Sequence, residues 1–194
     1  MVESWFPIPI YCNGIQGDAF NSVQAELSNI IELQSFQPKW NTHMLSDPTF
    51  TENLLIKYSA NKFLEQIDLH IKEYSRAIGY NKSPVYSVIE SWATKFQKGM
   101  YGHIHTHKDS DISGVYYFET NEKDGNLFFE SPVKQMNASY FTKDIPTRAS
   151  FSPQVGKLLL FPGWLSHGVE TNTTDTDRIS ISFNIVFEKY GMKL

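Results

Sequence analysis

The stretch Arg178-Ile-Ser-Ile-Ser-Phe-Asn-Ile-Val-Phe-Glu188 alternates between two kinds of side chain. One row is apolar and consists of Ile179, Ile181, Phe183, Ile185 and Phe187. The other row begins with a lone arginine and continues mainly with small polar residues: Arg178, Ser180, Ser182, Asn184 and Val186. Successive side chains of a β-strand point to opposite faces, so the pattern predicts a strand that is buried on one side. The polar row then faces either solvent or the interior of a binding pocket.

Short β-rich runs fill the chain after residue 80. Turn-forming sequences such as Asp124-Gly125-Asn126 and Pro162-Gly163 separate these runs. Many short strands at such spacing indicate a β-sandwich or barrel. The expected strands span residues 85–93, 102–107, 112–119, 126–130, 149–152, 157–161, 166–170 and 178–188.

The first 80 residues show helical spacing instead. Apolar residues at steps of three and four predict a helix over residues 18–34. A second helix is expected to begin at Ser46 or Asp47, with Pro48 in its first turn, and to end at Gly79. Its apolar stripe is typical of a helix packed on a sheet.

Two prolines restrict residues 5–11 to the edge of a sheet, where an exposed edge could support a homodimer. The chain is therefore expected to be mainly β with flanking α. We predict a single domain over residues 1–194, with an N-terminal strand and helices in 1–80 and a β-barrel core in 81–194.

The bulk composition excludes several classes of protein. With 194 residues and 41% hydrophobic residues, the chain can bury the core of one domain. The net charge is −4 and no run is rich in Lys or Arg, so neither nucleic acid nor a membrane is an expected partner. The single cysteine, Cys12, allows no internal disulfide and no cysteine-based zinc site. The chain shows no signal peptide and no apolar run of about 20 residues, so a cytoplasmic location is expected.

Four of the six histidines lie in two places. His103, His105 and His107 alternate in one segment, and His167 follows in Trp164-Leu-Ser-His167. Side chains two apart on a strand point the same way, so a pair of these imidazoles can close on one metal, with a third from a distant strand. Such a site keeps coordination positions open, as iron(II) enzymes that bind oxygen require. A surface cluster that binds metal only adventitiously is the main alternative.

Arg178 and Ser180 lie on the same side of the last strand. Arginine presents a planar fork that binds a carboxylate through two hydrogen bonds, and a hydroxyl two residues away can add a third. The alternative is an ordinary salt bridge from Arg178 to Glu119, Glu130 or another acid. Aromatic residues could line the same pocket or belong to the core: Trp92, Phe128, Phe161 and Trp164.

Two segments resemble those of a known family. The run His105-Thr-His107-Lys-Asp-Ser110-Asp-Ile-Ser113-Gly114-Val-Tyr-Tyr117 resembles the first metal-binding segment of a group of 2-oxoglutarate- and iron(II)-dependent oxygenases, long described as conserved hypothetical proteins. Gly156-Lys-Leu-Leu-Leu-Phe161-Pro162-Gly-Trp-Leu-Ser-His167-Gly-Val and the strand from Arg178 to Asn184 resemble the second segment, and the likeness covers most of the chain.

This resemblance implies a double-stranded β-helix, a jelly-roll barrel with the N-terminal helices packed on one side. It implies that His105, His107 and His167 hold Fe(II). It also implies that Arg178 holds the far carboxylate of 2-oxoglutarate, helped by Ser180 and Tyr117.

The metal ligands have one rival assignment. The wider superfamily uses His-x-Asp or His-x-Glu followed by a distant histidine, and His107-Lys-Asp109 fits that pattern. The triads His105, His107, His167 and His107, Asp109, His167 therefore compete, and the narrower group favours three histidines. Three neutral ligands leave the metal its full dipositive charge, whereas an aspartate cancels one unit.

The expected activity is that of a dioxygenase that oxidises an unidentified substrate by hydroxylation and releases succinate and CO2. The alternatives are a cupin-like oxygenase that does not use 2-oxoglutarate, and a non-enzymatic jelly-roll binding module.

Overall fold

The computed structural model describes residues 7–80, 83–133, 135, 138–140 and 142–188. Within them the strands are β1 (Tyr11–Gly14), β2 (Gln37–Lys39), β3 (His43–Leu45), β4 (Tyr86–Phe96), β5 (Gly102–His105), β6 (Ile112–Glu119), β7 (Leu127–Glu130), β8 (Arg148–Phe151), β9 (Lys157–Pro162), β10 (His167–Val169) and β11 (Arg178–Phe187). The helices are α1 (Gly17–Glu32), α2 (Leu54–Lys57) and α3 (Asn61–Ala77). None of the helices in these ranges has both the length and the apolar character needed to cross a membrane.

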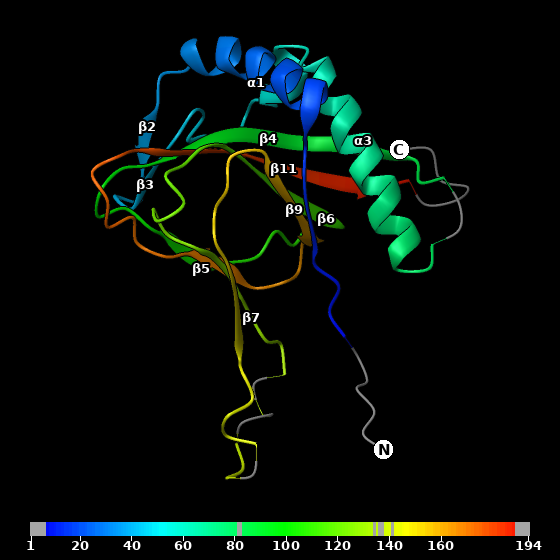
Figure 1. Cartoon of the computed structure of the whole chain (residues 1–194), viewed down its shortest axis with the longest axis vertical. Coiled ribbons are helices and arrows are strands. Elements are labelled where there is room, and N and C mark those ends of the chain that lie inside the picture. The colour runs from blue at the N-terminus through cyan, green and yellow to red at the C-terminus, as the bar shows by residue number, and fades with distance from the viewer. Residues whose placement is uncertain (1–6, 81–82, 134, 136–137, 141, 189–194) are drawn as a thin grey trace.

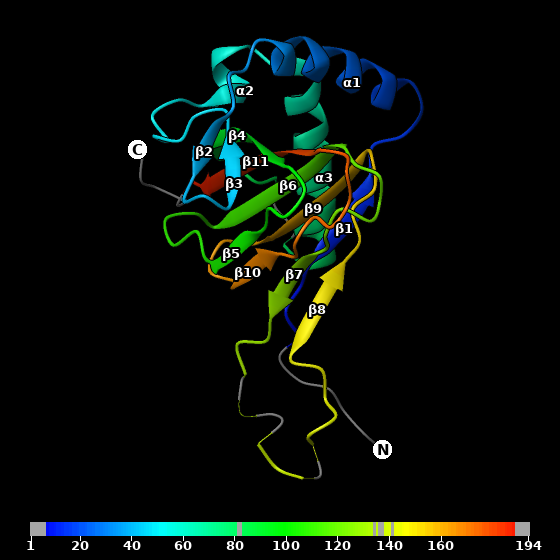
Figure 2. The same ribbon diagram turned by 90° about the vertical axis from the view of Figure 1, so that its left-hand side faces the viewer.

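The strands form two antiparallel sheets. The larger has the order β1-β9-β6-β11-β4-β3-β2, and the smaller has the order β5-β10-β7-β8. The helices lie on one side of the larger sheet, and the smaller sheet lies on the other side (Figure 1, Figure 2). The prediction of a mainly β fold with helices packed on one side is confirmed.

The two rows of β11 serve the two faces of the larger sheet. Ile181 and Phe183 are fully buried and belong to the same core cluster as Phe63 and Ile67 of α3. Burying a side chain of this size stabilises the fold by about 1.5–3 kcal/mol, so the apolar row fixes which face the helices cover. The polar row consequently points between the two sheets, where Arg178 is also buried. Of the two alternatives for that row, the structure shows the interior one, because Arg178, Ser180, Ser182 and Asn184 line a cavity instead of facing solvent.

The predicted strands after residue 80 are all present, and their bounds are close to those expected. The helix predicted over residues 18–34 is α1. The second helix ends as expected, because α3 stops at Ala77 and Gly79 has a positive φ of 84°.

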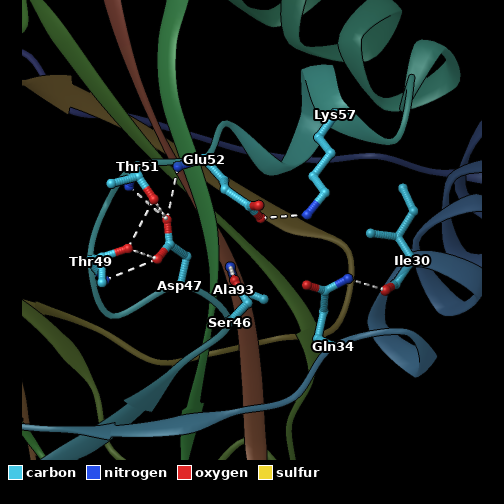
Figure 3. A network of polar contacts seen from close by, with 9 residues as sticks. All are labelled: Ile30, Gln34, Ser46, Asp47, Thr49, Thr51, Glu52, Lys57 and Ala93. Atoms are coloured by element: carbon cyan, nitrogen blue, oxygen red, sulfur yellow. Dashed lines mark hydrogen bonds and ion pairs between the residues drawn. The ribbon is translucent and has the colours of Figure 1, made fainter.

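The predicted start of the second helix was wrong. Residues 46–53 form a loop, in which the Asp47 carboxylate accepts hydrogen bonds from the backbone N–H groups of Thr49, Thr51 and Glu52 (Figure 3). Aspartate favours such local turns for the same reason that it favours helix starts, because it offers an acceptor to free N–H groups. The helical segment is also divided, since α2 ends at Lys57 and α3 begins at Asn61.

The first strand is also displaced from its prediction. Residues 5 and 6 lie outside the described part, residues 7–10 are not in a strand, and β1 begins at Tyr11. It does lie at an edge of the larger sheet, paired with β9. The short hairpin β2–β3, at the opposite edge, was not predicted.

Candidate metal and cosubstrate site

A cavity of about 880 Å³ lies between the two sheets. Strands β4 and β11 pair antiparallel, and their inward residues face each other as Glu90–Asn184, Trp92–Ser182, Thr94–Ser180 and Phe96–Arg178. All eight side chains line the cavity, and we refer to them as the cavity floor. This volume is typical of a small-molecule site.

Three histidines meet above the floor. His105 ends β5 and pairs with His167 of β10 in the smaller sheet, while His107 follows β5 by two residues. One nitrogen from each of the three rings lies within 4.8 Å of the others. Three nitrogens bonded to one ion at about 2.1 Å, on one side of it, lie about 3.0–3.4 Å apart, so the rings must close by up to about 1.4–1.8 Å to bind it together. The donor set fits a single divalent metal ion.

Two of the rings are oriented by the backbone. Nδ1 of His105 lies 2.7 Å from the carbonyl oxygen of His103, and Nδ1 of His167 lies 2.8 Å from that of Leu165. A carbonyl can only accept, so each Nδ1 carries the proton and each Nε2 keeps its lone pair for a metal.

The third ring, His107, has a side-chain neighbour. Its Nδ1 lies 3.3 Å from Nδ2 of Asn184, whose amide also donates to Glu90 at 2.8 Å. The Asn184 side chain therefore joins this ring to the far end of the cavity floor.

Burial keeps the histidines neutral. Burial, and next the neighbouring His105, lower the pKa of His107 to about 4. Burial followed by the same neighbour lowers the pKa of His167 to about 3. Neutral imidazoles are the form that binds metals, so no proton has to leave these two rings at neutral pH.

Asp109 lies apart from the three rings. The histidine cluster found in the described residues does not include it. Its side chain lines a second hollow of about 300 Å³, which shares Glu90, His107 and Asn184 with the larger cavity. The rival triad would need the loop that carries Asp109 to move.

Arg178 closes the other end of the cavity floor. Only 1% of its surface is exposed, and its guanidinium lies 5.1 Å from the Phe96 ring and 4.8 Å from the Tyr117 ring. Nη1 donates to the Gly125 carbonyl at 2.9 Å, while Nε has no hydrogen-bond partner. Within the described ranges Arg178 forms no ion pair, so the salt bridge to Glu119 or Glu130 is absent. A buried cation with an unused donor, in an open cavity, is suited to an anionic ligand.

The two predicted helpers of Arg178 differ in position. Ser180 is buried and lines the cavity next to Arg178. Tyr117 pairs with Ser180 across the strands but does not line the cavity, and its hydroxyl has no partner. Burial raises the pKa of Tyr117, so its hydroxyl stays protonated. Its ring supports the guanidinium from behind.

Several cavity residues were not predicted from the sequence. His43 had no predicted role, yet it lines the cavity and stacks on Phe96. Glu90 and Asn184 had no predicted role. Every second residue of β4 faces the cavity, and this alternation could have identified Glu90 from the sequence. His43 lies in a strand of three residues, which is too short to show such an alternation.

Of the four aromatic residues expected in the pocket or the core, Trp164 fits neither alternative. Trp92 and Phe161 line the cavity, whereas Phe128 and Trp164 do not. Trp164 is 54% exposed, and Phe128 packs under Arg148.

The fold and the site together define a jelly-roll barrel whose cavity is lined by a three-histidine cluster suited to a metal ion and by a buried arginine suited to an anion. Residues 90–184 match the family described as "Putative 2OG-Fe(II) oxygenase". The matched residues run from β4 to β11, so the barrel strands of this chain are similar to that oxygenase family. No curated protein matches the chain.

Solved structures share the fold. A 2OG-Fe(II) oxygenase family oxidoreductase from Burkholderia pseudomallei is 10% identical, with 90% of this chain and 92% of that chain covered and a TM-score of 0.62. A prolyl-4-hydroxylase from Pseudomonas putida is 14% identical, with 94% of each chain covered and a TM-score of 0.60. HygX from Streptomyces hygroscopicus, solved with nickel and 2-oxoglutarate, is 13% identical. The match covers 92% of this chain and 83% of the HygX chain, with a TM-score of 0.61. The expected double-stranded β-helix is thereby confirmed.

Proposed function

We propose that this protein is a 2-oxoglutarate- and Fe(II)-dependent oxygenase that hydroxylates a substrate still to be identified. One observation carries the proposal. A three-histidine cluster and a buried arginine with an unused donor lie in the same cavity. The family match of residues 90–184 supports the same reaction class.

In this proposal His105, His107 and His167 hold the iron through three neutral nitrogens. Arg178 binds the distal carboxylate of 2-oxoglutarate with its free Nε and the rest of its fork, and Ser180 adds a hydroxyl. Tyr117 keeps the guanidinium in place from beneath. When bound together, Fe(II) and 2-oxoglutarate supply the oxidation of a C–H bond by O2, with release of succinate and CO2.

The protein contributes position and a dry environment to that chemistry. Phe161 packs against His167, with the ring centroids 4.7 Å apart, and Trp92 lies 5.7 Å from His107. These rings fix two of the three ligands and restrict water around the iron site. A charge-assisted hydrogen bond from Arg178 is stronger in such surroundings than in water.

The proposal is tested by anaerobic calorimetry. Fe(II) is first titrated into the metal-free protein, and 2-oxoglutarate is then titrated into the Fe(II) complex. Both titrations should give heat in the wild type. Arg178→Ala should keep the iron step and lose most 2-oxoglutarate affinity, because a desolvated charge pair contributes about 2–5 kcal/mol.

The other outcomes are equally clear. Iron binding without 2-oxoglutarate binding would favour a cupin-like oxygenase, and binding of neither would favour a non-enzymatic module. Retention of 2-oxoglutarate affinity in Arg178→Ala would refute the role of this arginine.

We further propose a cytoplasmic location, supported by the single, exposed Cys12. A homodimer through the edge strand β1 is also proposed, because its outer edge has no strand partner among the described residues.

A further inference from the structure

We propose that the substrate carries a positively charged group, such as a guanidinium or an alkylammonium, and that Glu90 binds it. This inference rests on the proposed function, because that function determines which end of the cavity is left for the substrate. It concerns a residue that the oxygenase reaction itself does not require.

The cavity floor carries opposite charges at its two ends. Arg178 and Asn184 are six residues apart on β11, which corresponds to about 20 Å along a strand. Glu90 pairs with Asn184, so its carboxylate lies at the end opposite to the guanidinium. An arginine at one end and a glutamate at the other make the floor strongly dipolar.

The metal-binding rings lie towards the Glu90 end. His107 contacts Asn184 through Nδ1 at 3.3 Å, and Asn184 contacts Glu90 at 2.8 Å. In the proposed function, 2-oxoglutarate occupies the part of the cavity between the three histidines and Arg178. The substrate is therefore left with the space beyond His107, where Glu90 lies.

Glu90 is also the accessible end of the floor. Arg178 is 1% exposed, whereas Glu90 is half-buried and borders both hollows. Its Oε2 accepts from Asn184, and its Oε1 has no hydrogen-bond partner in the described part of the chain. No ion pair of Glu90 is found among those residues either. A carboxylate with a free oxygen at the mouth of a cavity is complementary to a cation.

The neighbouring side chains suit the body of such a substrate. Trp92 follows Glu90 on the floor, and Phe50 packs edge-on against Trp92 with ring centroids 5.5 Å apart. Aromatic faces bind cations and also cover the apolar groups to which those cations are attached. The combination of one carboxylate with aromatic walls favours an organic cation over a metal ion.

Two lysines are fixed cations that oppose this proposal. Lys108 borders the smaller hollow together with Glu90, but it is exposed and forms no ion pair with Glu90 in the described part of the chain. The second is Lys39. Its ammonium lies 4.8 Å from the Phe50 ring and 5.0 Å from the Trp40 ring, and it donates to the Pro48 carbonyl. It does not line the cavity. Lys39 is thus held by its own partners and leaves the Glu90 carboxylate unpaired.

The test compares two probes of the same shape. The binding of n-butylguanidinium and of neutral n-butylurea is measured by calorimetry at low ionic strength, with the full chain loaded anaerobically with Fe(II) and 2-oxoglutarate. The wild type should bind n-butylguanidinium at least about 10-fold more tightly than n-butylurea, as expected for a hydrogen bond between charged groups. In Glu90→Gln the two probes should bind about equally.

Matched variants separate the explanations. Glu90→Gln keeps an oxygen that accepts from Asn184, so its affinities for iron and 2-oxoglutarate should equal those of the wild type. Glu65→Gln makes the same charge change at an exposed position on α3, across the larger sheet from the cavity, and should preserve the preference for guanidinium.

Equal binding of the two probes by the wild type would overturn the proposal. A preference that survives in Glu90→Gln, or a loss of iron affinity in that variant, would also overturn it, because Glu90 would then act elsewhere or only through His107. If the wild type with Fe(II) did not bind 2-oxoglutarate at all, the proposed function would be refuted instead.

Discussion

Replacing Gly163 with alanine should damage the proposed metal site although it replaces none of the three histidines. Gly163 sits in the turn after β9, directly against the loop that carries His107. His107 donates its backbone N–H to the Gly163 carbonyl at 2.8 Å. A Cβ at position 163 would lie 2.4 Å from the Ser110 carbonyl oxygen and 2.7 Å from that of His107. Ordinary contacts begin near 3.4 Å, so the loop must retreat by about 0.7–1 Å.

The size of the effect follows from this displacement. Overpacking of this kind costs about 1–3 kcal/mol of stability, and a protein of this length loses about 2–4 °C in Tm per kcal/mol. A functional site tolerates about 0.5 Å of displacement, so Fe(II) affinity should fall by about 10- to 100-fold.

The assay is anaerobic calorimetry of Fe(II) binding, together with thermal unfolding of the metal-free chain. Gly14→Ala is the matched control, because its new Cβ meets only the Gly156 carbonyl at an ordinary 3.7 Å. Unchanged iron affinity in a folded Gly163→Ala variant would refute the placement of His107 against this turn.

Four other substitutions have defined outcomes. His105→Ala should abolish tight Fe(II) binding in a metal titration while Asp109→Ala retains it, and the reverse result would establish the rival triad. Gly114→Ala would place a Cβ 2.2 Å from the Phe183 ring and should lower the free energy of unfolding by about 1–3 kcal/mol in denaturant titrations. Burial raises the pKa of Asp47, but the hydrogen bonds from its loop outweigh burial and lower the pKa to about 2 from 3.8. Since the folded pKa is the lower one, this carboxylate should stabilise the wild type above about pH 4, and the contribution should vanish as the pH falls through 2. Asp47→Ala should show a weaker loss of stability in the same range, and an identical pH profile would contradict the role of the loop.

The strands of the barrel could be predicted because each shows a local pattern. The alternation from Arg178 to Phe187 encodes both faces of β11, and its apolar row meets the helices as the pattern requires. The loop at Asp47 could not be predicted in the same way. An aspartate followed by proline marks a helix start and a tight turn equally well, and only the hydrogen bonds to residues 49–52 distinguish them.

The site could be predicted where its residues share a strand or a motif. His105 and His107 are near neighbours in the sequence, and His167 meets them because β10 pairs with β5. The role proposed for Glu90 depends on its pairing with Asn184, 94 residues away, and no local sequence pattern contains that register. The position of Asp109 likewise depends on how its loop folds, which the sequence spacing leaves open.

A crystal structure of the anaerobic complex with Fe(II) and 2-oxoglutarate tests the central claim most directly. We expect one ion bound by nitrogens of His105, His107 and His167 at about 2.0–2.2 Å. We also expect the distal carboxylate of 2-oxoglutarate on the Arg178 guanidinium. An ion bound by Asp109 in place of His105, or a carboxylate bound away from Arg178, would contradict the account.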